Sequence, residues 1–315
     1  MGNDKKSILT KPWLVAILAM MCCALWGSAT PFIKVGYELA MPGRDLMPTF
    51  EKITSTILFA GIRFTLAGIL TVLIYSIGRK KFLLPQKRNW GKVLKVSTFQ
   101  TVLQYFFFYI GLSYTTGVKG TVITGGCNVF FSILIASLLF RQEKLTFKKI
   151  FACLIGFAGV ILINLNGLEL NFNFLGDGFA LISSICYAMS SSLVKIYSKD
   201  EDPVIISGWQ FIIGGAVMVI VSLCLGGHIE LTSFKAIGVL LYLAALSAVA
   251  YSVWGMLLKH NPVSKVSIYS FMTPVFGVLL SVLMLAEPST ATPIQLIITL
   301  VLICTGILIV NYKKD

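Results

Sequence analysis

The sequence predicts an all-α integral membrane protein with ten transmembrane helices, arranged as two inverted five-helix repeats with both termini in the cytoplasm. Three observations lead to this fold class: the composition, a row of ten apolar segments, and a set of motifs that occurs twice. Hydrophobic residues make up 57% of the chain and charged residues only 12%, whereas a soluble domain carries roughly 25% charged residues. The composition therefore favours a membrane protein over a soluble one.

The apolar residues fall into ten separate segments. A helix that crosses a bilayer needs about 20 mostly apolar residues, and short connections separate the segments that meet this requirement. The longest connection covers residues 36–52 and contains Pro42, Gly43 and Pro48. We expect membrane-spanning helices at residues 13–35, 53–77, 93–114, 120–140, 150–165, 176–197, 204–225, 236–258, 266–285 and 294–312.

Basic residues mark one side of the predicted membrane. The connections that follow the odd-numbered segments hold little more than Arg44, Lys52, Lys119 and Lys235. Because cytoplasmic loops carry an excess of Lys and Arg, this asymmetry places both termini in the cytoplasm and accounts for the net charge of +13 without a nucleic-acid partner. The predicted cytoplasmic side carries Lys5, Lys6, Lys11, Arg79, Lys80, Lys81, Lys87, Arg88, Lys92, Arg141, Lys144, Lys148, Lys149, Lys199, Lys259, Lys265, Lys313 and Lys314.

The chain repeats itself, with one predicted repeat at residues 13–165 and the other at residues 176–312. Residues 26–34 align with residues 187–195, and both stretches end in a lysine. Ile-Arg-Phe at 62–64 aligns with Trp-Gln-Phe at 209–211, and GVILIN at 159–164 matches GILIVN at 306–311. Each repeat contains an odd number of spans, so the second is inverted. Inverted repeats are typical of alternating-access transporters, with the substrate site near the midplane.

Several short motifs occur in the same order in both halves of the chain. Together they resemble the drug/metabolite transporter superfamily, in particular its EamA-type family. The set comprises Leu25-Trp26-Gly27 with the later Lys34, the span-ending Glu143 and Glu287, Pro274 in the ninth span, and glycine-rich fifth and tenth spans. The resemblance implies ten helices, a central cavity lined mainly by helices one, three, four, six, eight and nine, and export or exchange of small metabolites. One departure is Phe130, which occupies the position equivalent to Pro274.

Polar and aromatic residues inside the spans are the candidates for lining that cavity, because polar groups within a membrane helix face protein or water. Packing or interhelical hydrogen bonds, worth only about 0.6 kcal/mol each on average, are the alternative interpretation. Aromatic rings with a few hydrogen-bonding groups suit a small amphipathic solute such as an amino acid. The predicted substrate-binding residues are Trp26, Ser28, Thr30, Gln104, Tyr109, Thr124, Asn128, Tyr187, Trp254 and Tyr269.

Arg63 and Lys34 are the predicted gating or charge-compensating residues. Arg63 lies about 15 Å into its span, at about 1.5 Å per residue, where a charge costs at least about 2.5–3.5 kcal/mol. Either an anionic substrate group or a structural bond, to carbonyls or to Glu51 or Asp177, compensates it; the family's cavity favours the structural role. Lys34 either anchors at the interface or gates. Glu143 is expected to cap a helix or pair with a loop.

These features together predict a multi-pass transporter of the bacterial cytoplasmic membrane that exports amino acids or related metabolites by alternating access. No carboxylate falls in the middle of a span, which favours exchange or export down a gradient over a proton-coupled drug or metabolite antiporter. A membrane-embedded enzyme would need clustered catalytic groups, and His228 and His260 fall on opposite sides. We expect no cofactor, no metal site and no disulfide from the seven cysteines, with a small-molecule substrate and the lipid bilayer as partners of a monomer or homodimer.

Overall fold

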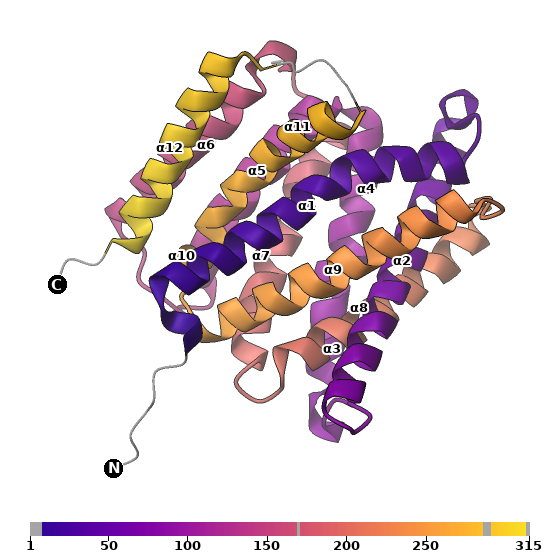
Figure 1. Cartoon of the computed structure of the whole chain (residues 1–315), viewed down its shortest axis with the longest axis horizontal. Coiled ribbons are helices and arrows are strands. Elements are labelled where there is room, and N and C mark those ends of the chain that lie inside the picture. The colour runs from indigo at the N-terminus through magenta and orange to yellow at the C-terminus, as the bar shows by residue number, and fades with distance from the viewer. Residues whose placement is uncertain (1–7, 169–170, 286–290, 313–315) are drawn as a thin grey trace.

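The computed structural model describes residues 8–168, 171–285 and 291–312, and within these residues it contains helices and no strands. Helices occupy each of the ten predicted segments (Figure 1). Their bounds are α1 Pro12–Ala40, α2 Thr49–Gly78, α3 Trp90–Ser97 continued by η4 Thr98–Leu103 and α4 Gln104–Tyr114, α5 Gly117–Leu134 continued by η5 Ile135–Leu139, α6 Phe147–Ile163, η7 Phe174–Gly178 continued by α7 Phe179–Tyr197, α8 Pro203–Cys224, α9 Phe234–His260, α10 Val263–Ser267 continued by η8 Ile268–Phe271 and α11 Met272–Leu285, and α12 Pro293–Asn311.

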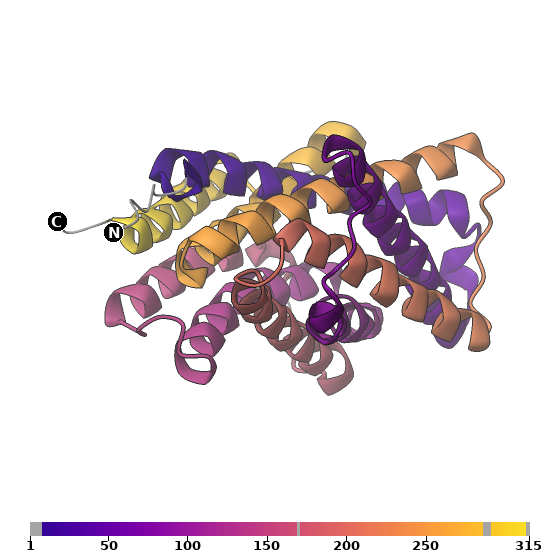
Figure 2. The same ribbon diagram turned by 90° about the horizontal axis from the view of Figure 1, so that it is seen from below.

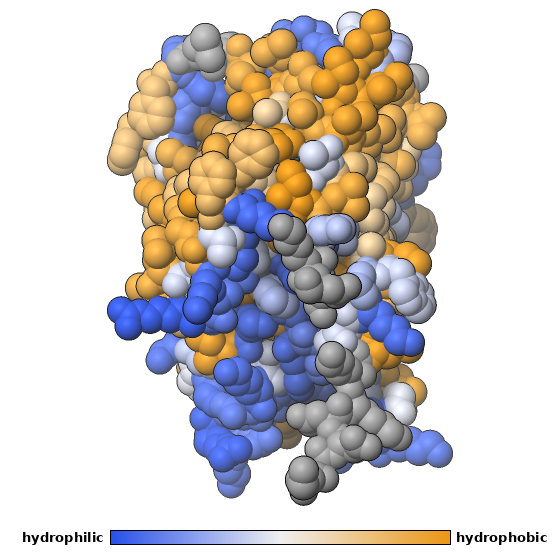
Figure 3. All heavy atoms as spheres, turned by 90° about the vertical axis from the view of Figure 1, so that its left-hand side faces the viewer, coloured by the Kyte–Doolittle hydropathy of each residue, from blue (hydrophilic) through white to orange (hydrophobic). Residues whose placement is uncertain are grey.

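Eight of these helical runs, among the residues that the structure describes, are long and apolar enough to cross a membrane. The other two are α6, with only 17 residues, and the run from α3 to α4, whose apolar character Gln100 and Gln104 interrupt. Figure 3 shows hydrophilic residues gathered toward the lower end of the molecule and an apolar surface above them. The chain is an all-α membrane protein.

Local sequence signals explain where several helices begin. Asp202 accepts a hydrogen bond from the amide of Val204 and precedes a proline at the first position of α8. Ser233 caps α9 in the same way, and Thr292 forms a capping box with Gln295 at the start of α12. Side-chain oxygens at this position satisfy amides that have no partner inside the helix. These three caps therefore mark where α8, α9 and α12 begin.

The helices pack in a pattern that is unchanged when the two halves are exchanged. α2 packs on α8, and α6 packs on α12, so each of these helices meets its own predicted equivalent. α1 contacts α9 and α11, and α7 makes the equivalent contacts with α4 and α5. α1 and α9 run side by side in both ribbon views (Figures 1 and 2). This packing brings residues of both halves together at the centre of the molecule.

The α2–α8 crossing depends on two glycine pairs. A methyl group on Gly68 would lie 2.5 Å from the carbonyl oxygen of Gly208, and one on Gly61 would lie 3.0 Å from that of Gly215. In the register that aligns residues 62–64 with 209–211, Gly61 is equivalent to Gly208 and Gly68 to Gly215. Exchanging the two halves therefore turns one contacting pair into the other. Small residues let membrane helices approach closely and gain van der Waals contact. The crossing holds the two halves together beside the central site.

Prolines affect the two halves differently. Pro31 lies inside a continuous α1. Since proline lacks an amide N–H, the carbonyl of Gly27 loses its usual helical partner, and this carbonyl faces Gly277 of α11. In the ninth span a 3₁₀ turn, η8, precedes Pro274, whereas α5 continues as a helix through the equivalent Phe130.

Candidate functional site

Trp26 of α1 lies against two aromatic residues of α9. Its ring centroid is 5.2 Å from that of Tyr251 and 4.9 Å from that of Trp254, and both contacts are edge-to-face. Trp254 and Tyr251 are buried, and Trp26 is half-buried. These aromatic contacts join a helix of the first predicted repeat to a helix of the second. We call this group, together with Phe64, Tyr105 and Phe211, the central aromatic site.

The other three members of the site come from α2, α4 and α8. Phe64 and Phe211, which align in the repeat, stack at 5.1 Å with an interplanar angle of 9°. Phe64 lies 4.3 Å from the ring of Tyr105, and Phe211 lies 4.9 Å from that of Tyr251. The hydroxyls of Tyr105 and Tyr251 are 2.6 Å apart and share a hydrogen bond. Five helices from both halves therefore meet in one continuous aromatic cluster.

Arg63 lies within this cluster, 5% exposed, with its guanidinium 4.3 Å from the centre of the Phe64 ring. Its electrostatic neighbours are four tyrosines, Tyr37, Tyr105, Tyr109 and Tyr251. A cation over an aromatic ring gains electrostatic energy, and so do hydroxyl oxygens that face it. The side chain is thus surrounded by neutral groups.

Neither acidic partner predicted for Arg63 is its partner. Glu51 lies 3.5 Å from the Nε2 atom of His228. Asp177 lies 2.6 Å from the ammonium of Lys119 and also accepts a hydrogen bond from Thr115. Both acids are at the end of the molecule opposite to the chain termini and are bound locally. Glu51 and Asp177 are therefore bound elsewhere, while the bond to helix carbonyls and the anionic substrate group stay predictions.

Several buried polar atoms around the centre have no hydrogen-bond partner within the described part of the chain. The donors include the indole nitrogens of Trp26 and Trp254 and the Nε atom of Arg63. The acceptors include the side-chain oxygens of Gln100 and Gln104. A buried polar group without a partner costs about 1–3 kcal/mol, so a bound solute that supplied partners would recover that energy.

The structure brings part of the predicted substrate-binding set to the centre. Trp26 and Trp254 are in the central aromatic site, and Tyr109 lies 5.9 Å from Tyr105, ring to ring. Tyr187 is buried and within electrostatic range of Tyr105. Gln104, which directly precedes Tyr105, is buried too. These residues remain candidates for contact with a solute.

Other predicted residues are used or placed differently. Ser28 bonds the hydroxyl of Tyr242 at 2.8 Å and the carbonyl of Leu25, so it ties α1 to α9. Thr124 donates to the carbonyl of Gly120 in its own helix, and Thr30 is exposed. Asn128, also in the predicted set, is half-buried. Tyr269, the last of the set, is buried, and its backbone carbonyl accepts a hydrogen bond from the thiol of Cys23.

The end-of-span charges mostly bind locally. Glu143 accepts hydrogen bonds from the amide and hydroxyl of Ser264, at 2.9 and 2.6 Å, and pairs with Lys149. The predicted loop pairing of Glu143 is confirmed, while Glu287 lies outside the described residues. Lys195 donates to the carbonyls of Leu258 and Asn261 rather than reaching for the membrane surface. Lys34 is exposed on the outer part of α1.

The sequence-based list missed Phe64 and Phe211. Both are fully buried members of the site. The signal was present, because each is the third residue of the aligned motifs at 62–64 and 209–211.

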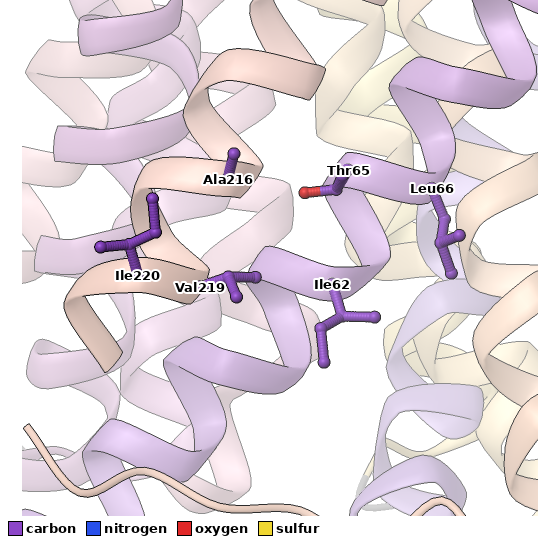
Figure 4. Close-up of a pocket in the computed structure, with 6 residues that line it drawn as sticks. All are labelled: Ile62, Thr65, Leu66, Ala216, Val219 and Ile220. Carbon is purple, nitrogen blue, oxygen red and sulfur yellow. The ribbon is translucent and has the colours of Figure 1, made fainter. Parts of the chain in front are cut away.

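Two hollows lie away from the central aromatic site. The larger, of about 320 Å³, is a groove between α2 and α8 (Figure 4), and its one polar side chain, Thr65, donates to the carbonyl of Gly61. The smaller is lined by Tyr114, Thr115, Thr116, Lys119, Asn171 and Asn173. An apolar groove with its hydroxyl already bonded fits a lipid chain better than a polar metabolite.

Bonds between the halves close the end of the molecule where α1 begins and α12 ends. Arg79 lies 2.6 Å from Asp202, and Lys92 lies 2.5 Å from Asp200. Gln142 donates to the carbonyl of Ser192 at 3.0 Å. The Lys92 ammonium holds the pKa of Asp200 below its ordinary value. These contacts hold the two halves together at this end of the molecule.

Comparison with known proteins gives consistent matches over most of the chain. The EamA-like transporter family model matches residues 13–165 and 174–312. "Uncharacterized transporter YvbV" of Bacillus subtilis (strain 168) is 26% identical over 95% of this chain and 92% of its own. "Uncharacterized transporter sll0355" of Synechocystis sp. is 28% identical over 84% of this chain and 80% of its own. A protein crystal structure aligns with a TM-score of 0.73 over 94% of this chain and 96% of its own, at 16% identity.

Proposed function

The chain belongs to the EamA-like transporter family, and from this premise we propose that it exports small organic metabolites, amino acids or related compounds, across the cell membrane by alternating access. In this proposal the ten helical runs all span the bilayer. The first five and the last five form inverted repeats, with both termini in the cytoplasm. The family model's two separate matches and the exchange-symmetric packing support this arrangement.

The observation that carries the proposal is the central aromatic site. It lies where both halves meet, it is buried, and it combines aromatic surface with unsatisfied indole and amide groups. Small-molecule sites are mostly apolar with a few placed polar groups, and in transporters they lie between the repeats near the midplane. A solute would separate Trp26 from Trp254 and bond the groups that now lack partners.

The proposed movement is a rocking of the two halves about the α2–α8 crossing. The glycine pairs keep these helices in contact, while the bonds of Arg79, Lys92 and Gln142 break when the terminal end opens. Two of these three bonds are ion pairs near the loops, and ion pairs at a protein surface contribute little net stability. Opening this end therefore requires little energy from any single contact.

An export screen tests the function. Cells that overproduce the protein should release at least one amino acid or related metabolite faster than cells without it, and Trp26→Ala should abolish the release at equal membrane abundance. Trp13→Ala is the matched control, because Trp13 is on the same helix but 57% exposed. Unchanged release by Trp26→Ala would place the substrate path elsewhere.

A further inference from the structure

Arg63 is a buried cation for which the described residues supply no balancing charge. The side chain is 5% exposed, and all four of its electrostatic neighbours are tyrosines. A charge at this depth costs at least about 2.5–3.5 kcal/mol in a membrane helix. Such a cost persists in a folded protein only when the structure or a ligand compensates it.

Four acidic side chains of the described residues near the two ends of the bundle are bound elsewhere. Glu51 is beside His228, and Asp177 is beside Lys119. Glu143 binds Ser264 and Lys149. At the terminal end Glu201 accepts hydrogen bonds from the amide of Gln86 and the side chain of Asn89. None of these acids is available to Arg63 without breaking its present contacts.

The donors around Arg63 also lack an acceptor. Its Nε atom and the indole nitrogens of Trp26 and Trp254 are buried without partners among the residues described. Trp26 touches Tyr251, and Tyr251 shares a hydrogen bond with Tyr105, which faces the guanidinium. The oxygens of Gln100 and Gln104 lack donors as well, but unpartnered donors beside a buried cation favour a ligand group that supplies both acceptors and a negative charge. A guanidinium binds a planar carboxylate through two parallel hydrogen bonds.

We propose that Arg63 is the anion-binding group of the transport site and that the substrate carries a carboxylate. This inference rests on the proposed transport function and assigns the chemical class of its substrate, a small carboxylic acid with an apolar or aromatic body. The carboxylate pairs with the guanidinium between the tyrosines. The body of the substrate occupies the space that opens between Trp26 and Trp254.

The repeat provides an internal reference for this assignment. The residue equivalent to Arg63 is Gln210, which is fully buried. Its side-chain oxygen accepts a 2.6 Å hydrogen bond from Thr101, and its backbone carbonyl accepts one from Ser97. The position can therefore be filled by a neutral residue that bonds within the protein, so helix packing alone does not require a charge at Arg63.

Counterflow in proteoliposomes tests the assignment on the unaltered protein. The probes are the common L-amino acids, simple mono- and dicarboxylates, and the C-terminal amides of the same amino acids. We expect at least one carboxylate to be exchanged and its amide to be exchanged about 10- to 100-fold more slowly, which is the factor for losing one charge-assisted hydrogen bond. Equal exchange of an acid and its amide overturns the assignment.

Variants of Arg63 provide the second arm. Arg63→Gln should slow carboxylate exchange by the same factor as replacing the acid with its amide. Arg63→Lys should retain part of the exchange, because lysine keeps the positive charge but lacks the planar guanidinium that binds a carboxylate through two hydrogen bonds. Arg88→Gln is the control, because Arg88 is an exposed loop residue. Inorganic phosphate and chloride are added as competitors. Stronger inhibition by either than by any carboxylate overturns the carboxylate assignment in favour of an inorganic anion.

The outcomes separate this inference from the function on which it rests. If the protein exchanges a neutral or cationic solute, and Arg63→Gln exchanges it equally well, the transport function stands and the role of Arg63 is structural. If the protein exchanges no probe in liposomes where a reconstituted control transporter is active, both the function and the carboxylate assignment fail.

Discussion

The middle of α2 and the middle of α8 occupy equivalent places in the two halves but differ in what their central polar residue does. On α8, Gln210 bonds Thr101 and Ser97 and holds α3 and η4 against its helix. On α2, Arg63 has a charge, an aromatic ring beside it and no acidic neighbour among the residues that the structure describes. The phenylalanines that follow them stack on each other. The two helices pack against each other, yet the groups that surround their central polar residues differ.

Arg63→Gln makes α2 resemble α8 and is the change with the largest expected effect. Carboxylate transport should fall about 10- to 100-fold, because one charge-assisted hydrogen bond is lost. The melting temperature of the purified protein should stay equal or rise, because an uncompensated buried charge is removed. A lower melting temperature together with unchanged transport would show that Arg63 supports the fold instead.

Gly68→Ala tests the crossing that both regions share. The added methyl group would lie 2.5 Å from the carbonyl oxygen of Gly208 and 2.6 Å from the amide nitrogen of Ile212, both backbone atoms. Overpacking of this kind costs about 1–3 kcal/mol. Chemical denaturation in detergent measures the loss. Gly78→Ala at the end of the same helix meets nothing within 4 Å and should be neutral; equal losses for both would contradict the close crossing.

Thr101→Val removes the donor that Gln210 requires. The valine keeps the shape of the side chain, so the expected loss of about 1–3 kcal/mol in the free energy of unfolding reflects a buried oxygen without a partner. Transport per folded molecule should be unchanged. Thr98→Val, whose hydroxyl bonds only the carbonyl of Leu94 in its own helix turn, is the control. Loss of transport in Thr101→Val would remove the distinction between the two regions.

Lys92→Met has the smallest expected effect and concerns the closed terminal end. Lys92 lowers the pKa of Asp200, and a carboxylate with a lowered pKa stabilises the fold above its unfolded pKa of about 3.9. The variant should melt slightly lower than the wild type at pH 7, and the difference should vanish as the pH falls through the folded pKa of Asp200. Lys95→Met is the control; a difference that persists in acid, where Asp200 is protonated in the folded protein, would exclude this ion pair as its cause.

The sequence predicts the helices well because long apolar segments separated by short polar turns have few alternatives in a bilayer. It also identifies Arg63 by depth alone. It does not predict what surrounds Arg63, because Glu51 and Asp177 are selected by local contacts with His228 and Lys119 that only the packed structure defines. The π-helical turn at Thr98–Leu103 has no sequence signal that we recognised, although it brings Thr101 to Gln210.

One counterflow experiment tests the asymmetry of the two halves most directly. Wild-type protein, Arg63→Gln and Thr101→Val are reconstituted at equal amounts of folded protein, and exchange of a radiolabelled amino-acid mixture is measured. We predict equal exchange by the wild type and Thr101→Val and loss of exchange by Arg63→Gln. Equal exchange by Arg63→Gln, or equal losses in both variants, would contradict the account that α2 binds the substrate and α8 holds the fold.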